Sequence, residues 1–300
     1  MAVHAPTATV GVLGSQSSLA RAWSSIRRYP VVPIVIITTL AVFAIFAPLI
    51  APHDPEQARS LDDRTLPPSW MDDESIFFLG TDHLGRDVFS RIVYGARISL
   101  LVSSTVLAAG LVIGTTVGLI SGYFGGNTDE LLMRLVDIKL SLPFILVALV
   151  VAIVFKPSLL LVVILLALFF WSSFARQVRA ETLHLKTLDY VMAARVAGAS
   201  NLRIMIKHIL PGVFSTIIVI ATLTIGTVIL VESVLSYLGV GVPAPTPAWG
   251  AMVADGSQYL QSAWWIALFS GAAIFFTVLG FNFLGDWLRD NLDPRLRQLV

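Results

Sequence analysis

Six long apolar runs constrain what this chain of 300 residues can fold into. A helix needs about 20 apolar residues to cross a hydrocarbon core of roughly 30 Å. The runs occupy residues 31–50, 98–122, 131–155, 159–174, 213–238 and 263–284, and we expect the short fourth run to continue through Arg176. Charged residues make up only 13% of the chain, against roughly a quarter in ordinary soluble domains. The sequence therefore predicts an all-α, multi-pass membrane protein with six transmembrane helices.

Within the second run, Gly110, Gly114 and Gly118 lie four residues apart on one side of the predicted helix. Small residues at this spacing let two helix backbones approach closely. We therefore expect this stripe to pack against another helix.

The placement of Lys and Arg residues predicts the orientation of the helices. If the N-terminus lies inside, fourteen of the twenty basic residues fall in inner loops and tails, an excess that is typical of the cytoplasmic face. We therefore expect both termini in the cytoplasm, and the run at 31–50 is long enough to be a retained span rather than a cleaved signal. The predicted parts are a tail at 1–30, a first span at 31–50, an extracytoplasmic loop at 51–97, a five-helix core at 98–287 with a cytoplasmic loop at 176–212, and a tail at 288–300.

The composition argues against several kinds of chemistry. A net charge of +1 leaves no basic excess for binding a nucleic acid, and the absence of cysteine excludes disulfides, thiol nucleophiles and thiolate metal sites. None of the four lysines follows a glycine, so the nucleotide-binding P-loop is missing. We expect this chain to bind no cofactor or metal itself, and any energy source to lie in another protein.

A polar segment at 188–212 separates the fourth and fifth runs. Asp189 is suited to the N-cap of a short helix and Gly198 to its left-handed end. Such a short helix needs a surface to lie on, because nucleation costs more than two turns return. Ala193 and Ala194 would let a partner approach closely. A docking element and a solvated loop helix both stay open.

The same segment resembles the EAA loop of the membrane subunits of bacterial ABC importers. That loop reads Glu-Ala-Ala, three residues, Gly, nine residues and Ile-x-Leu-Pro. Here Met192 takes the Glu position and His208 the Ile position, whereas the other positions match. The resemblance implies that the loop couples the membrane part to a cytoplasmic ATPase. The residues to which we assign this role are Asp189, Tyr190, Ala193, Ala194, Arg195, Gly198, Leu210 and Pro211.

A second motif, LGTDHLGRDVFSRIVYGARISL at 79–100, narrows the family. Asp82 and Asp87 flank Arg86 and could form a local ion-paired knot, although solvated charge is the default expectation. The pattern resembles the GTDxxGRD segment of the C-type permeases of dipeptide, oligopeptide and nickel importers, and the likeness continues in stretches to Arg297. The likeness is greatest to the dipeptide permeases. The motif residues are Gly80, Asp82, Gly85, Arg86 and Asp87.

The resemblance implies a type I ABC importer permease fold in the bacterial cell membrane. It implies three kinds of protein partner besides membrane lipid: a homologous B-type permease subunit, two cytoplasmic ABC ATPase subunits that use ATP and Mg, and an extracytoplasmic substrate-binding protein. The chain would form half of a translocation pathway for dipeptides or short peptides without being an enzyme. Oligopeptides, glutathione, nickel chelates or haem pass through similar subunits, so the solute stays open.

Glu232 lies inside the fifth run, where a carboxylate is costly and marks a functional hypothesis. It could line a substrate path, pair with a partner subunit or merely lie near the membrane interface, and these interpretations stay open. Hydroxyl residues before and after it would make one side of the helix wettable. The predicted pathway residues are Thr224, Thr227, Glu232 and Ser236.

The segment at 239–261 contains three prolines near its start, which forbid a regular helix there. We expect either a rigid external loop or a cap over the translocation path. Trp264 and Trp265 follow, and we interpret them as anchors at the membrane surface.

Two other classes compete with the transport subunit. A membrane-embedded enzyme would need catalytic residues, but the chain contains neither HExxH nor GxSxG. A secondary transporter usually shows two repeat halves with broken helices at the midplane. Six apolar runs with a single polar loop do not match that pattern well.

Overall fold

The computed structural model describes residues 30–292 apart from residues 59 and 74, so most of the predicted tail at 1–30 and the end of the tail at 288–300 lie outside it. Within this part no strand occurs, and an isolated β-bridge joins Thr81 to Asp87. Among the described residues, five stretches are long and apolar enough to cross a membrane. They are α2 (Val31–Ile50), α3 (Val88–Phe124), α6 (Leu159–Leu185), the continuous run of α8, η2 and α9 (Asn201–Tyr237) and α11 (Trp264–Leu292).

The third predicted span is broken rather than straight. It consists of α4 (Gly126–Ser141) and α5 (Phe144–Val154), which meet at an angle of 78°. The break falls at Leu142 and Pro143, both extended in backbone conformation, because proline lacks an amide donor and disfavours a helical residue before it. The pair makes a sixth crossing if it counts as one span. The prediction of one regular helix at 131–155 was wrong, whereas the all-α class is confirmed.

Three of the other helical stretches extend further into polar sequence than predicted. The first span matches its prediction, and α6 continues through Arg176 as expected. However, α3 begins at Val88, so the predicted loop at 51–97 ends ten residues early. Residues 201–212, predicted as loop, are helical and include the π-helix η2 (Met205–Ile209), and α11 continues to Leu292.

The glycine stripe of α3 packs directly against α6. A Cβ at Gly114 would lie 2.3 Å from the carbonyl oxygen of Trp171, and one at Gly118 would lie 2.6 Å from that of Ala175. No side chain fits at such distances, so the two backbones touch because these positions are glycine. The predicted packing role of the stripe is confirmed.

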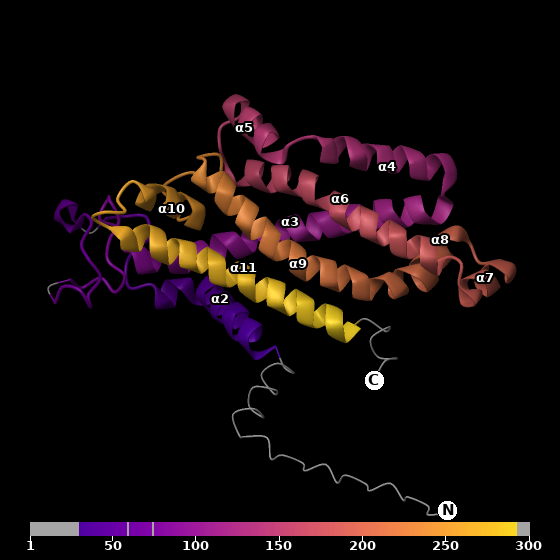
Figure 1. The fold of residues 1–300 in the computed structure, drawn as a ribbon, viewed down its shortest axis with the longest axis horizontal. Coiled ribbons are helices and arrows are strands. Elements are labelled where there is room, and N and C mark those ends of the chain that lie inside the picture. Colours follow the sequence, from indigo (N-terminus) through magenta and orange to yellow (C-terminus); the bar gives the residue numbers. More distant parts are fainter. Residues whose placement is uncertain (1–29, 59, 74, 293–300) are drawn as a thin grey trace, which may run out of the picture.

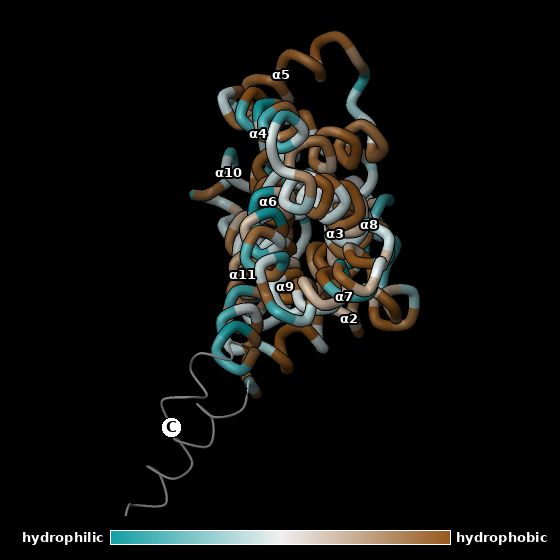
Figure 2. The backbone as a smooth tube through the Cα atoms, turned by 90° about the vertical axis from the view of Figure 1, so that its right-hand side faces the viewer, coloured by the Kyte–Doolittle hydropathy of each residue, from teal (hydrophilic) through white to brown (hydrophobic). Residues whose placement is uncertain are grey.

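The long helices lie side by side and carry different structures at their two ends (Figure 1). One end holds the segment before α3, which includes η1 (Leu61–Asp63), together with α10 (Trp249–Ser257). The other end holds α7 (Asp189–Val196). Viewed toward the α7 end, hydrophilic residues lie along parts of α4 and α6, whereas α5 is hydrophobic throughout (Figure 2).

Candidate functional site

The end opposite α7 is a folded cap, which we define as residues 51–87 and 239–263. Its motif at 80–87 is a tight turn, in which the Asp82 amide donates to the Arg86 carbonyl at 2.9 Å. Gly80 and Gly85 have φ angles of +75° and +81°, which residues with a Cβ rarely adopt. A Cβ at Gly80 would also lie 2.6 Å from the carbonyl oxygen of Leu66. The backbone geometry of the turn therefore requires both glycines of the motif.

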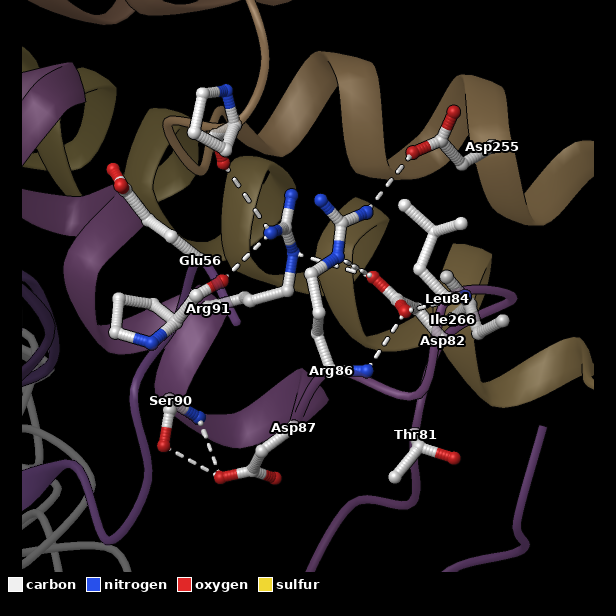
Figure 3. Close-up of polar contacts among 12 residues, drawn as sticks. Glu56, Thr81, Asp82, Leu84, Arg86, Asp87, Ser90, Arg91, Asp255 and Ile266 are labelled. Carbon is white, nitrogen blue, oxygen red and sulfur yellow. Dashed lines mark hydrogen bonds and ion pairs between the residues drawn. The ribbon is translucent and has the colours of Figure 1, made fainter. Parts of the chain in front are cut away.

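Asp82 holds two arginine side chains inside the cap (Figure 3). Its Oδ2 accepts a hydrogen bond from Arg86 Nε at 2.7 Å and lies 3.5 Å from Arg91 Nε. Its Oδ1 accepts the backbone amides of Leu84 and Arg86 at 2.9 and 3.0 Å. Asp82, Arg86 and Arg91 are at most 5% exposed. Buried charges of this kind need both ion pairing and hydrogen bonding, and the turn supplies both.

The two arginines join the turn to the rest of the cap. Arg91 Nη1 donates to the carbonyl of Pro55 at 2.7 Å and lies 3.5 Å from the carbonyl oxygen of Pro245 in the proline-rich segment. Arg86 Nη2 lies 3.9 Å from Asp255 Oδ2 on α10. Stretches far apart in the sequence therefore converge on one ionic cluster.

The predicted knot is confirmed for Asp82 and Arg86 but not for Asp87. Asp87 instead caps α3, because its carboxylate accepts the amides of Phe89 and Ser90 at 3.3 and 3.2 Å. It also lies 3.3 Å from His53 Nδ1. The default expectation of solvated charge was wrong, since all three charged motif residues are buried.

Two tryptophans connect the cap to the helices through hydrogen bonds. Trp249 at the start of α10 donates its indole N–H to the carbonyl of Ile92 at 3.0 Å, and Trp265 donates to the carbonyl of Thr81 at 3.1 Å. Both rings are buried, so the interpretation of Trp265 as an anchor at the membrane surface was wrong. The prolines keep residues 240–248 out of a helix, as predicted.

At the opposite end lies the α7 loop, which we define as residues 186–209. Its helix begins at Asp189, and Leu188 is the N-cap residue. The N-cap therefore lies one residue before Asp189, the residue predicted for it. Gly198 has a φ of +80°, and the amides of Gly198 and Ala199 bond back to the carbonyls of Arg195 and Ala194 at 3.0 and 3.1 Å. The predicted left-handed end of the helix is confirmed.

Few contacts hold α7 in place. Val191 is its buried residue and packs in an apolar cluster with side chains of α3, α6 and η2. The Arg195 guanidinium lies 5.7 Å from the centre of the Tyr123 ring, and the Tyr123 hydroxyl donates to Asn201 Oδ1 at 2.8 Å. These contacts anchor α7 to the corner between α3 and α4.

The outer face of α7 is exposed. Met192 is 49% and Val196 is 89% exposed, and Ala193 lies beside them on the surface. The Tyr190 hydroxyl donates to the carbonyl of His208 at 3.2 Å. Leu210 packs against the same apolar cluster as Val191 at the start of α9, and the next residue, Pro211, is exposed. The predicted docking residues therefore share one end of the molecule.

A hollow of about 430 Å³ opens between α4, α6 and α9. Thr224 and Thr227 line it from α9, so these two predicted pathway residues lie together. The polar residues that line it from α6 are Ser172, Ser173, Arg176 and Gln177, and the apolar lining residues are Leu140, Phe170, Ile220 and Leu223. The hollow therefore has a mixed wall, with hydroxyl, amide and guanidinium groups beside apolar surface.

Glu232 and Ser236 do not share this hollow. Glu232 is 1% exposed, and its Oε1 accepts the Ser236 hydroxyl at 2.7 Å. Ser236 Oγ in turn lies 3.4 Å from the amide nitrogen of Val242, which donates to it from the proline-rich segment of the cap. The expected wettable stripe is thus divided into two threonines at the hollow and a buried pair at the cap.

Among the described residues, no group of three His, Asp or Glu side chains is placed to hold a metal ion.

Comparison with known proteins gives the family. Residues 114–298 match the family described as the binding-protein-dependent transport system inner membrane component, and residues 19–68 match the N-terminal transmembrane domain of oligopeptide transport permease C. The chain belongs to this family of ABC permeases. It is a multi-pass protein of the bacterial inner membrane, and its family role is that of a transport subunit.

Named relatives cover most of this permease. The dipeptide transport system permease protein DppC of Alkalihalophilus pseudofirmus is 43% identical over 90% of this chain and 87% of its own length. The oligopeptide permease OppC of Bacillus subtilis is 40% identical over 90% and 87%, and the glutathione permease GsiD of Pectobacterium atrosepticum is 42% identical over 86% and 84%. A solved structure of the MetNI methionine ABC transporter in inward-facing conformations is 21% identical with a TM-score of 0.56, covers 68% of this chain and 96% of its own, and supports the fold.

Sequence reasoning about this permease missed the partners of its motif residues. Arg91 meets a carbonyl 154 positions away, and Asp255 reaches Arg86 from α10. Tyr123, the anchor of Arg195, gave no signal as a single tyrosine at the end of an apolar run. Contacts between residues far apart in the chain leave no periodic pattern in the sequence. The one available signal for the cluster was Arg91, a charged residue just before a predicted span.

Proposed function

We propose that this chain forms half of the translocation pathway of an ATP-driven importer of dipeptides or short peptides. The observation that carries the proposal is that the exposed α7 lies in the chain between α6 and α9, two helices that line the hollow. α6 leads from the hollow residues Arg176 and Gln177 directly to the α7 loop. A partner that binds α7 would therefore act on the walls of the hollow. Dipeptides are the first candidate solute because relatives with that printed name match most of the chain.

In this proposal the α7 loop faces the cytoplasm and the cap faces outside. Two ATPase subunits bind ATP and Mg and dock on α7, a substrate-binding protein delivers peptide at the cap, and a B-type permease supplies the other half of the pathway. This chain contributes no nucleotide site, because its sequence contains no P-loop.

The sidedness has a direct test, because the chain has no native cysteine. Met71 in the cap is 52% exposed and Leu202 in the α7 loop is 63% exposed. In intact cells freed of their outer membrane, Met71→Cys should react with an impermeant thiol reagent, whereas Leu202→Cys should react only after permeabilisation. The reverse pattern would overturn the proposed orientation.

Transport is tested with the complete complex in proteoliposomes. We expect uptake of a labelled dipeptide that requires ATP, both permeases and the binding protein. Competition by unlabelled dipeptide, oligopeptide and glutathione then ranks the solutes. ATP-dependent uptake of a non-peptide solute alone would reject the peptide assignment, and uptake without any ATPase subunit would reject the importer class.

A further inference from the structure

We propose that the hollow holds the carboxylate end of the passing peptide, with Lys139 as the cationic group that attracts it and Arg176 beside it. The inference rests on the proposed peptide transport, and it adds a subsite of defined charge to the pathway. The ligand group is a carboxylate at one end of a short peptide.

The charges around the hollow are unequal in number. Arg176 lines the hollow and pairs with Asp137 of α4 at 2.5 Å, with both side chains more than half exposed. Lys139 lies two residues beyond Asp137 on the same helix. The lining residues contributed by α9 are apolar or carry hydroxyl groups. Two cations and one carboxylate therefore leave an excess of one positive charge beside the hollow.

Lys139 is the group without an anionic partner. Its ammonium donates to Ser172 Oγ at 2.6 Å and to the carbonyl of Phe169, and it lies 4.5 Å from the centre of the Phe169 ring. Among the described residues it makes no ion pair, and Asp137, the carboxylate two residues before it on α4, pairs with Arg176 of α6. A cation in a membrane-spanning segment is costly without a counter-charge, and such residues mark ion and substrate pathways.

The contact with Ser172 connects this charge to the hollow. Ser172 lines the hollow, so the Lys139 ammonium stands 2.6 Å from an atom of its lining residues. The hydroxyl of Thr227 on α9 is exposed and donates within its own helix to the carbonyl of Leu223. Its oxygen remains free to accept a hydrogen bond from a peptide N–H. Thr227 thus offers an acceptor for the peptide backbone, and the Lys139 ammonium beside Ser172 offers the positive charge for the carboxylate.

A free carboxylate and its amide distinguish this subsite from general affinity for peptides. We would measure equilibrium binding of Ala-Phe and of Ala-Phe amide to the nucleotide-free complex, without the binding protein. In the unmodified complex the free acid should bind about fivefold more tightly, the equivalent of about 1 kcal/mol for two unit charges 4 Å apart in water. Lys139→Gln should reduce this ratio to near one, and Lys139→Arg should retain it.

Two matched controls remove other lysine or arginine charges. Lys156→Gln removes an exposed lysine between α5 and α6, and Arg134→Gln removes an arginine on the outer face of α4 that is 72% exposed. Both should leave the acid-to-amide ratio unchanged. Equal binding of acid and amide in the unmodified complex, no binding of either peptide, or an unchanged ratio in Lys139→Gln would overturn the subsite.

The proposed function fails separately from the subsite. It fails if the complete complex does not import dipeptides in the presence of ATP and binding protein. The subsite fails if import proceeds but the binding ratio shows no dependence on Lys139. The two assays use different states of the same complex, so the two failures can be told apart.

Discussion

The two ends of this permease are stabilised in opposite ways. The cap end buries an ionic cluster, in which Asp82 contacts both Arg86 and Arg91 and none of the three is more than 5% exposed. The α7 loop buries one side chain of its helix, Val191, and leaves Val196 89% exposed. The cap therefore carries its own structural determinants, whereas α7 presents an exposed surface, on which we propose that a partner docks. This difference predicts that changes in the cap act on stability and changes at α7 act on coupling.

The largest expected effect is in the cap. Asp82→Ala removes the one carboxylate that contacts both buried arginines, and breaking a buried ion pair costs about 3–5 kcal/mol. We expect a low yield of folded protein and a large fall in thermal unfolding temperature in detergent.

The exposed pair of α4 provides the matched control. Glu130→Ala removes the partner of Arg134, in a pair with 61% and 72% exposed side chains, and exposed pairs contribute about 0–1 kcal/mol. Equal losses in the two variants would show that the cap cluster is not the stabilising feature we describe.

At α7 we expect loss of transport with normal insertion. Gly198→Val places a β-branched residue at a φ of +80°, which costs about 1–2 kcal/mol. The position is otherwise open, because no atom lies within 4 Å of where the new Cβ would stand. Backbone conformation, not a clash, should therefore misdirect the loop. Peptide uptake and peptide-stimulated ATP hydrolysis should fall together while membrane levels stay normal.

A bulky residue on the same helix tests the surface itself. Ala194→Trp should block close approach of a partner, whereas Ala194→Ser should be tolerated. Wild-type transport by both Gly198→Val and Ala194→Trp would reject α7 as the docking surface.

A smaller effect on transport is expected at Tyr123, which contacts Arg195 of α7. Tyr123→Phe removes the hydroxyl that donates to Asn201 but keeps the ring beside Arg195. The loss of one hydrogen bond is worth about 1 kcal/mol. We expect normal protein levels and more ATP hydrolysed per peptide imported, with Tyr237→Phe, an exposed tyrosine at the end of α9, as the control. An unchanged ratio of ATP to peptide would remove Tyr123 from the coupling route.

The smallest effect is expected at Glu232. Gln retains an oxygen that accepts the Ser236 hydroxyl, and the substitution replaces the buried carboxyl group with an amide of similar size. We expect Glu232→Gln to assemble normally and to transport within about twofold of wild type. Normal assembly with a strong loss of uptake would restore the pathway interpretation, and weak assembly would restore the pairing interpretation.

The sequence predicted the membrane-crossing character well because apolar length decides it. The first span was predicted with its observed bounds, and Gly198 was correctly placed in the left-handed region. Helix ends were less predictable, because a charge such as Arg91 lies on α3 yet interacts with the cap. Hydropathy alone assigned that residue to the loop.

Burial of the cap charges could not be predicted from local sequence. The motif showed Asp82 and Arg86 close together, but the cluster also includes Asp255 beside Arg86 and Pro245 beside Arg91, which come from another part of the chain. Likewise Thr224, Thr227, Glu232 and Ser236 lie on one helix, and only the packing of its neighbours separates the hollow from the cap.

The glycine stripe of α3 has a mechanical consequence. At Gly114 and Gly118 the backbones of α3 and α6 approach so closely that relative sliding would bring carbonyl groups into collision. These two helices should therefore tilt as a single stiff rod, with α7 near one tip and the arginine cluster near the other. A push applied at one membrane face would reach the opposite face as a swing of the whole rod, without any helix having to bend in between.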